Sequence, residues 1–368
     1  MTRLPFRLPW ITVLFALLCA SPSSGASSQP DTFAKLRKAA QTARQEALNP
    51  PDPASAAENA VRAYLNTIDP YSTYLTAAQY ASLHAAPGEY VGVGMDIVQS
   101  PEGILYCLPF RGGPADMAGI RRGDMLFSIN DTPASQYPLL VIESMIRGKR
   151  GSSIKLGVFS EAGVFRYVIA RDVVRRRDVE AVKVGQLPCI RIRRFSASTV
   201  DELRSCLDSA APDSPLVLDI RDNVGGDLKA AIAAADFFLQ PGKKIAQLRD
   251  RKGMAGNYSS GKGDKARTGP LVIWQDSFTA SASEVFCAAL VDNKAATNVG
   301  RRSFGKGIAQ RIIPAGDGDY FVITTGRLFR PDGESFHVRG IEPAFAVDSS
   351  HDKDDEAYLR RTYELIGR

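Results

Sequence analysis

Hydrophobic and polar positions change their spacing along the chain, and each change marks a different kind of region. Residues 32–86 carry helical spacing, as in the segment Phe33–Ala40, and Pro50, Pro51 and Pro53 interrupt it. Residues 88–172 show short alternating runs between glycine turns, which are typical of a β-rich domain. From 180 to 345, apolar runs of strand length alternate with helical stretches, and this order predicts an α/β domain.

The third region contains the clearest elements. We expect strands at 190–195, 216–220, 271–274 and 320–325, and helices at 200–207 and 280–290. A polar, glycine-rich stretch from Gly253 to Gly269 predicts a loop. The pattern therefore predicts a mixed α/β protein. Its parts are an N-terminal helical region at 27–87, an inserted-like β-rich domain at 88–172, an α/β core at 173–348 and a C-terminal helical tail at 349–368.

Two short segments of the core carry candidate chemistry. They are Thr279-Ala-Ser-Ala-Ser-Glu284 and Ser303-Phe-Gly-Lys-Gly-Ile-Ala-Gln310. Ser281 and Lys306 lie 25 residues apart, so only the tertiary fold can bring them together. If they meet, the serine is a nucleophile and the lysine its general base. Burial must then lower the pKa of the amine well below its reference value of about 10.4, and the apolar and glycine neighbours of Lys306 favour such burial.

Each segment also has a purely structural interpretation. Ser281 and Glu284 fit a helix capping box, with the serine as N-cap and the glutamate at N3. A lysine between two glycines is typical of a solvated turn. Both interpretations of Ser281 can hold together, because free backbone N–H groups at a helix start would also stabilise an oxyanion.

At these two segments the chain resembles the carboxyl-terminal processing proteases, also called tail-specific proteases. That family reads Ser-Ala-Ser-Ala-Ser-Glu at its nucleophile and Phe/Tyr-Gly-Lys-Gly-x-x-Gln at its base, with the same separation of 25 residues. The resemblance implies a crotonase- or Clp-protease-like α/β core. In that core Ser281 is the nucleophile, Lys306 the general base and Gln310 the residue that orients the lysine. Asp69-Pro-Tyr-Ser-Thr-Tyr-Leu75 is similar to another motif of the family, and alone it predicts only a turn.

A third segment, Leu216–Leu228, adds a candidate oxyanion hole. It reads as a buried strand, a loop with two glycines and a helix start, which alone is an ordinary strand-to-helix turn. The family has a similar Asp-Leu-Arg-x-Asn-Pro-Gly-Gly segment whose glycine amides help to form the oxyanion hole. The resemblance therefore implies Gly225, Gly226 and the N–H of Ala282 as donors. Val224 replaces the usual proline, which removes no donor.

The β-rich region resembles a PDZ domain of the processing-protease type. The resemblance rests on Gly113-Pro-Ala-Asp-Met-Ala-Gly-Ile-Arg-Arg-Gly-Asp124. A PDZ groove binds a chain end as an added strand, and amides of a glycine loop hold the carboxylate. This implies a peptide-binding site flanked by a helix near 139–146 and formed by Tyr90, Val91, Gly92, Val93 and Gly94. The alternative is a small β-rich domain without a ligand.

The first 26 residues are typical of a secretory signal peptide. Arg3 and Arg7 precede an apolar run from Trp10 to Ala20, and small residues follow up to Ala26. We therefore expect an exported protein, periplasmic in the simplest case, with no stable transmembrane segment after cleavage. An uncleaved N-terminal anchor and full secretion are the alternatives.

Composition sets further limits. With 44% hydrophobic and 23% charged residues the chain is typical of globular proteins. The basic run at 175–177 has no interleaved aromatic residues and precedes Asp178, which indicates a solvated surface and no nucleic-acid site. Metal-binding cysteine or histidine patterns are not found, and we expect no cofactor. The cysteines beyond the signal lie in apolar patterns that favour free thiols, and they are Cys107, Cys189, Cys206 and Cys287.

These observations predict a serine endopeptidase whose partners are polypeptide substrates with free C-termini. The PDZ domain would capture the tail, and the core would cut near it. Two alternatives stay open. One is a binding protein in which an inactive core supports a PDZ adaptor, and the other is an acyl-transfer enzyme on a crotonase-like core. A homo-oligomer or an adaptor partner also stays open.

Overall fold

The structure, a computed structural model, describes residues 31, 33–83, 89–100, 102–261, 269–348 and 354–367. The expected signal peptide at 1–26 lies outside these residues. Within them, no helix has the length and apolar character needed to cross a membrane. Contacts divide the chain into two units, one up to Ala56 and the other from Ala57 onward.

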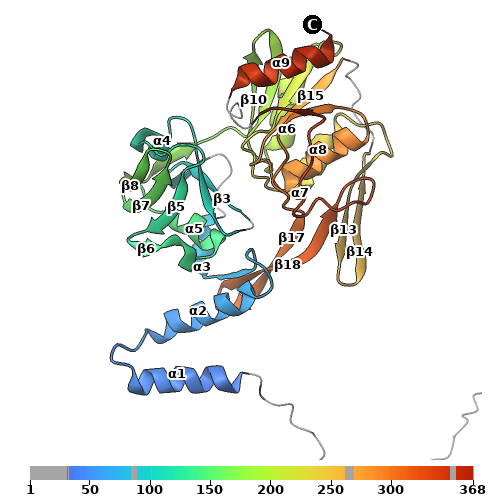
Figure 1. The fold of residues 1–368 in the computed structure, drawn as a ribbon. Helices are drawn as coiled ribbons and strands as arrows, with labels where there is room; N and C mark the ends of the chain where they lie inside the picture. The colour runs from blue at the N-terminus through green and yellow to red at the C-terminus, as the bar shows by residue number, and fades with distance from the viewer. Residues whose placement is uncertain are drawn as a thin grey trace, which may run out of the picture. The chain divides into compact units, whose positions relative to one another are not determined.

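The first unit contains helix α1 (Ala34–Glu46), which buries none of its side chains. Helix α2 (Pro53–Asn66) begins at the end of this unit and continues into the second one along the chain. Helix α3 (Ala77–Leu83) follows within the second unit. The expected N-terminal helices are therefore present (Figure 1).

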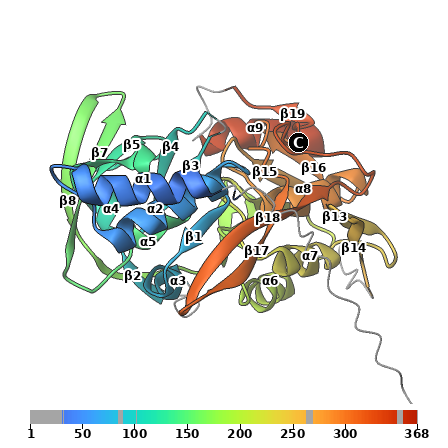
Figure 2. The same cartoon turned by 90° about the horizontal axis from the view of Figure 1, so that it is seen from below.

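The N-terminal region also contains a strand that its sequence pattern does not indicate. Strand β1 (Thr73–Leu75) pairs antiparallel with β18 (Asp319–Phe329), and Figure 2 shows the two side by side. Three residues are too few to give a periodic signal, so the expectation of a purely helical region at 27–87 is incomplete. Through β1, this region becomes part of a sheet of the core.

The β-rich domain is built around a sheet in the order β3-β4-β5-β7-β8, with β6 paired to β5. Its strands are β3 (Met95–Gln99), β4 (Leu105–Pro109), β5 (Met125–Ile129), β6 (Thr132–Pro133), β7 (Ser153–Ser160) and β8 (Gly163–Ala170). Its helices are α4 (Pro114–Ala118), the short 3-10 helix η1 (Ala134–Gln136) and α5 (Leu139–Ile146). Strand β2 (Glu89–Gly92) pairs with β9 (Asp172–Arg175), so the two ends of the domain run side by side.

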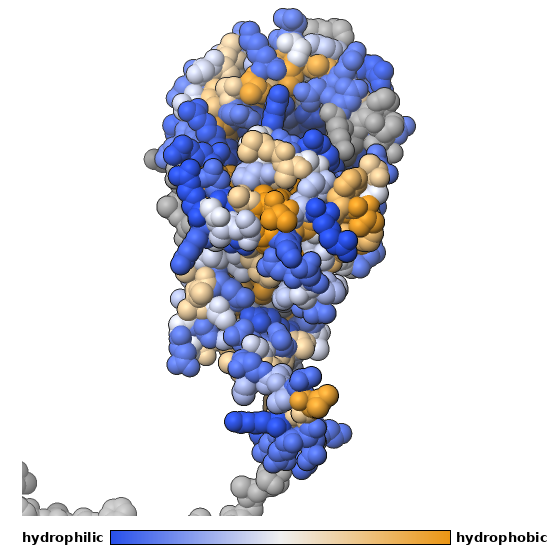
Figure 3. All heavy atoms as spheres, turned by 90° about the vertical axis from the view of Figure 1, so that its left-hand side faces the viewer, coloured by the Kyte–Doolittle hydropathy of each residue, from blue (hydrophilic) through white to orange (hydrophobic). Residues whose placement is uncertain are grey.

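Strand β8 lies at the edge of this sheet and leaves Val164 and Val168 exposed. Figure 3 shows the left-hand side of Figure 1, where apolar patches interrupt a mostly polar surface. Single exposed apolar side chains are normal on protein surfaces. These positions alone therefore do not indicate a binding site.

The core contains a sheet in the order β10-β11-β12-β15-β16-β19. Strand β10 (Val179–Val184) is antiparallel to β11 at one edge, and the remaining neighbours are parallel. The parallel strands are β11 (Leu187–Ile192), β12 (Leu216–Asp219), β15 (Leu271–Gln275), β16 (Thr297–Gly300) and β19 (Phe345–Ala346). The alternation of strands and helices in the sequence predicts such a parallel sheet.

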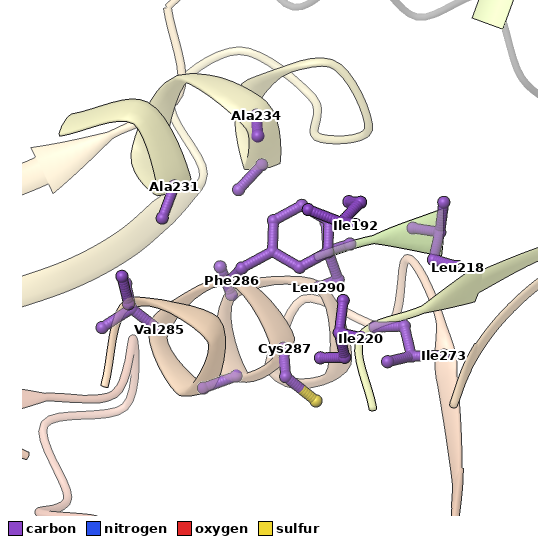
Figure 4. Packing of buried hydrophobic residues seen from close by; sticks show 14 of the residues in the cluster. Ile192, Leu218, Ile220, Ala231, Ala234, Ile273, Val285, Phe286, Cys287 and Leu290 are labelled. Atoms are coloured by element: carbon purple, nitrogen blue, oxygen red, sulfur yellow. The ribbon is translucent and has the colours of Figure 1, made fainter. Parts of the chain in front are cut away.

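Alternate side chains of this sheet contribute to two hydrophobic clusters. Leu218 and Ile273 belong to the cluster that includes residues of α6 (Thr199–Asp208), α7 (Leu228–Asp236) and α8 (Ala282–Asp292). Figure 4 shows Phe286 and Leu290 of α8 packed in this cluster near Ile192. The cluster fixes α8, whose residues 282–290 are all buried.

The second cluster includes residues of the C-terminal helix α9 (Asp355–Ile366). Trp274 of β15 is fully buried there, and its indole N–H donates to the Thr362 hydroxyl at 2.9 Å. Tyr358 donates its hydroxyl to the carbonyl oxygen of Gln275 at 3.0 Å. Residues 355–366 of the segment expected as a helical tail therefore form a helix, and this helix packs against the core.

A further sheet, in the order β1-β18-β13-β14 with β17 paired to β18, completes the core. Its additional strands are β13 (Lys244–Asp250), β14 (Gly253–Ser259) and β17 (Ile308–Gly316). The expected loop at 253–269 is wrong for residues 253–259, which form a hairpin with β13. Strand β14 lies at the sheet edge with mostly exposed side chains, so its polar composition hides it.

Candidate active site

Ser281 lies at the N-cap of α8, in the loop that follows β15. Its backbone has φ 58° and ψ −118°, a conformation that residues other than glycine rarely adopt. The buried carboxylate of Asp276 fixes the loop by accepting hydrogen bonds from the N–H groups of Phe278 at 3.0 Å and Thr279 at 2.9 Å. The loop thus holds Ser281, which is partly exposed, at the start of a buried helix.

Lys306 lies between β16 and β17, where its amine nitrogen is 4.5 Å from the centre of the Tyr71 ring. Burial lowers the pKa of the Lys306 amine, whereas the carboxylates of Glu143, Asp69 and Glu284 act in the opposite direction. Burial is the largest of these causes, so the net direction favours the neutral amine. A lysine general base requires this form.

Glu284 connects the segments that carry Ser281 and Lys306. Its Oε2 accepts hydrogen bonds from the backbone N–H of Ser281 at 2.8 Å and from that of Lys306 at 2.8 Å. Its Oε1 accepts from the N–H of Gly305 at 2.6 Å and from the Ser303 hydroxyl at 2.6 Å. Burial raises the pKa of Glu284 to about 7, and the four hydrogen bonds act to lower it. One buried carboxylate therefore brings both segments to a single point.

The sequence indicated Glu284 only as the N3 residue of a capping box. The bond from Ser281 N–H to its carboxylate confirms that part of the interpretation. Its reach to residues 303–306 depends on β16 pairing beside β15. No local pattern can show that pairing, so the sequence missed the second role.

Gly225 packs directly against the predicted nucleophile. A methyl group added to Gly225 would lie 2.9 Å from Cβ of Ser281 and 3.0 Å from the backbone nitrogen of Ala282. Its φ of 104° also favours glycine. Its own N–H donates to Oδ1 of Asn223 at 3.0 Å. Ala282 is the first residue of α8, where a backbone N–H has no acceptor inside the helix.

The structure places Gly226 differently. A methyl group added there would lie 2.1 Å from the carbonyl oxygen of Phe195, and the residue is exposed. Phe195 also donates its N–H to the carbonyl oxygen of Gly225 at 3.0 Å. The glycine pair is thus anchored to Phe195, which lies just after the end of β11. Of the three predicted donors, Gly225 and Ala282 lie next to Ser281.

Gln310 lies on β17 and donates its side-chain N–H to the carbonyl oxygen of Tyr71 at 2.6 Å. It lines a cavity of about 40 Å³ together with Lys306, Tyr71 and Glu143. Asp69 holds the Tyr71 turn, because its Oδ1 accepts the N–H of Tyr71 at 2.8 Å. The segment that the sequence indicated as a turn therefore belongs to the surroundings of the predicted base.

Arg122 joins the β-rich domain to the loops around Ser281. Its guanidinium donates to the carboxylates of Asp222 and Asp276 and lies 4.8 Å from the centre of the Phe278 ring. Asp222 follows β12 in the loop that leads to the two glycines, and Asp276 lies in the loop that leads to Ser281. One arginine of the β-rich domain thus contacts both loops.

The expected glycine loop at residues 90–94 is shorter in the structure. Tyr90, Val91 and Gly92 belong to β2 and pair with β9. The N–H of Val93 donates to the carbonyl oxygen of Ile146 at 3.2 Å, and the carbonyl oxygen of Gly94 accepts the N–H of Phe110 at 2.9 Å. The partner strand β9 is distant in the sequence, so a local pattern cannot predict this pairing.

The cysteines contribute no evident chemistry. Cys107, Cys189 and Cys287 are buried and Cys206 is partly buried, and none of the four is in a disulfide. Burial raises the pKa of each thiol, which disfavours the reactive thiolate. In the described part of the chain, no group of three acidic, histidine or cysteine side chains could hold a metal ion.

Sequence comparisons assign both domains. Residues 186–347 match the model of peptidase family S41, and residues 82–159 match the PDZ domain. A probable CtpA-like serine protease of Staphylococcus epidermidis is 29% identical over 345 residues, which cover 92% of this chain and 70% of that protein. A probable CtpA-like serine protease of Staphylococcus aureus is 32% identical over 285 residues, which cover 76% of this chain and 58% of that protein.

A solved structure agrees at the level of the fold. The photosystem II D1 C-terminal processing protease matches with a TM-score of 0.70 and 24% identity, covering 92% of this chain and 91% of that chain. The expected combination of an α/β protease core with a PDZ domain is confirmed. The chain belongs to peptidase family S41, as a PDZ-containing serine protease of the carboxyl-terminal processing type.

Proposed function

We propose that this protein is an exported endopeptidase that cuts polypeptides at or near their C-termini with a Ser281–Lys306 dyad. The observation that carries the proposal is the convergence of both residues on the carboxylate of Glu284. The direction of the Lys306 pKa, below its usual value because of burial, supports its role as base. The placement of Gly225 against Ser281 supports an oxyanion hole at this point.

In the proposed mechanism, the Ser281 hydroxyl attacks the scissile carbonyl carbon while the Lys306 amine takes the hydroxyl proton. The carbonyl oxygen becomes an oxyanion, which the N–H of Ala282 and an N–H of the Gly225–Gly226 loop stabilise. Lys306 then gives its proton to the leaving amine as the peptide bond breaks. Water hydrolyses the acyl-enzyme by the reverse sequence, with Lys306 again as base.

The two glycines of the loop are alternative donors to the oxyanion in this scheme. The N–H of Gly225 is bonded to Asn223, so it must exchange that acceptor for the oxyanion. Gly226 is the alternative donor from the same loop. Gln310 is proposed to orient Lys306 through Tyr71. The Gln310 side chain donates to the carbonyl oxygen of Tyr71, and the ring of Tyr71 lies against the Lys306 amine.

The PDZ domain is proposed to hold the substrate tail beside edge strand β3, with α5 as the opposite wall. Strand β3 ends the sheet order, and an edge strand has unpaired backbone groups to which a peptide can add. Because Val93 donates to Ile146, the amides that follow it, at Gly94 and Met95, are the candidates for holding the carboxylate. Export to the periplasm is proposed from the signal-like segment at 1–26.

The test compares cleavage of an unfolded protein by the wild type, Ser281→Ala and Ser283→Ala. Ser283 is the matched control, because its hydroxyl is buried without a hydrogen-bond partner in the structure. We expect the Ser281 variant to lose cleavage and the Ser283 variant to keep most of it. Full cleavage by Ser281→Ala would exclude the dyad, and absence of cleavage by the wild type would favour a PDZ adaptor.

The role of the tail needs a separate measurement. The same peptide with a free or an amidated C-terminus is compared by kcat/KM. Backbone amides that recognise a carboxylate predict a lower value for the amidated peptide. Equal values would mean that this PDZ domain does not read the chain end.

A further inference from the structure

Helix α5 of the PDZ domain forms one wall of the cavity that contains Lys306. On this side the cavity is lined by Leu139, Leu140 and Glu143 of α5 and by Pro138, which precedes the helix. The N-terminal region contributes Pro70, Tyr71 and Thr73, and the core contributes Lys306 and Gln310. Among these lining residues, Glu143 is the carboxylic acid and Lys306 is the amine. An acid of one domain therefore faces the proposed base of the other across a space of about 40 Å³.

The other carboxylates near Lys306 have fixed partners. Asp69 accepts the backbone N–H groups of Tyr71 and Ser72. Glu284 accepts the four hydrogen bonds described above. Asp69 therefore holds the site from the N-terminal region, and Glu284 holds it from the core. Glu143 differs, because it reaches the cavity from the PDZ domain.

The cations near Glu143 differ in which other groups they contact. The pKa of Glu143 is raised overall, and burial is the largest cause. Asp96 acts in the same direction as burial, whereas Arg194, Lys306 and Arg147 act to lower this pKa. Arg147 donates to the carbonyl oxygens of residues 82 and 83. Arg194 lies within 4.0 Å of Asp96. Lys306 is thus the cation that shares the cavity with Glu143.

We propose that Glu143 is a positioning residue for Lys306: from the docked helix α5, its carboxylate favours the ammonium form of the base. The consequence for catalysis rests on the proposed function, because only a neutral amine accepts the serine proton. The geometry gives the effect a direction. Removal of the Glu143 charge makes Lys306 easier to deprotonate, and the displacement of α5 has the same effect. The helix that flanks the peptide groove therefore also tunes the base.

The test measures the protonation of Lys306 without relying on proteolysis. In full-length protein carrying Ser281→Ala, cyanate modifies neutral amines, and peptide mass spectrometry follows the modification of Lys306 from pH 6 to 10. Glu143→Gln should move the midpoint of this profile down by about one pH unit, with up to about tenfold faster modification below the midpoint. Glu161→Gln is the matched control, because it removes one exposed carboxylate from a turn of the same domain.

Superimposable profiles for Glu143→Gln and its parent would overturn the proposal, as would an equal shift in Glu161→Gln. A change in the rate of Lys306 modification by the same factor at every pH would indicate a structural effect, and it would also contradict the proposal. If Glu143→Gln does not fold, Glu143→Met is measured instead, with the same expected shift. In active protein, cleavage by Lys306→Ala would refute the dyad, while the cyanate profile would still decide the role of Glu143.

Discussion

Ser281 and Lys306 donate their backbone N–H groups to the same oxygen, Oε2 of Glu284, at 2.8 Å each. The two residues are 25 positions apart in the sequence, and Glu284 is fully buried. If either segment moved away, the buried carboxylate would lose at least one of its four hydrogen bonds, which is costly. The spacing between the proposed nucleophile and base is therefore set by one side chain that belongs to neither.

Replacing Glu284 by glutamine should impair both stability and activity. An amide has one acceptor oxygen, so its NH₂ group would face N–H or hydroxyl donors that now bind a carboxylate. We expect the free energy of unfolding to fall by about 2–4 kcal/mol, with a large loss of kcat/KM. Urea unfolding and peptide cleavage measure the two effects. Glu342→Gln, at an exposed position, is the control, and native stability of Glu284→Gln would contradict the argument.

Lys306→Arg should be as inactive as Lys306→Ala, with a loss of at least about 100-fold in kcat. Arginine keeps the positive charge but does not lose a proton at accessible pH. The pKa of Lys306 is lowered, so the neutral form gains population as pH rises through a value below 10.5. Wild-type kcat/KM should therefore rise with pH across that range. Substantial turnover by Lys306→Arg would show that the lysine acts through its charge.

Gly225→Ala should abolish cleavage. The added methyl would lie 2.8 Å from the carbonyl oxygen of Ala280 and 2.9 Å from Cβ of Ser281, and φ is strained for alanine. We expect a loss of at least about 100-fold in kcat, the scale of losing an oxyanion donor. Gly242→Ala is a matched control, because its φ of 77° is also positive and no atom lies within 4 Å of the added methyl. Equal losses in both variants would assign the effect to backbone strain alone.

Periodicity and local motifs predict the parts of this structure that are local. Apolar runs such as 216–220 indicate buried strands, and the N-terminus of α8 follows from the capping pattern of Ser281 and Glu284. Short or polar strands escape this reasoning. Strand β1 has three residues, and β14 shows exposed side chains at an edge, so neither gives a clear alternation.

Some residues of the site could likewise be predicted from local sequence, and others could not. Ser281, Lys306 and the two glycines carry recognisable motifs, whereas their partners depend on contacts between distant segments. Arg122 and Asp276 are 154 residues apart and come from different domains. Glu143 lies in an apolar helical stretch in which nothing marks a carboxylate as facing a lysine of the core. Only the packing of α5 against the core reveals these groups.

Arg122→Ala tests whether contact between the domains supports the active-site loops. The guanidinium binds Asp276, which is fully buried, and Asp222 in the neighbouring loop. Its loss removes this ion pair from a buried carboxylate, a change that costs about 3 kcal/mol in comparable sites. We expect a lower melting temperature and a lower kcat. Arg121→Ala is the matched control, because that adjacent arginine is exposed and its side chain bonds within its own domain, to Asp116 and to the carbonyl oxygen of Ile120. If both variants melt and turn over alike, the contact made by Arg122 does not stabilise the loops that carry Ser281 and the oxyanion donors.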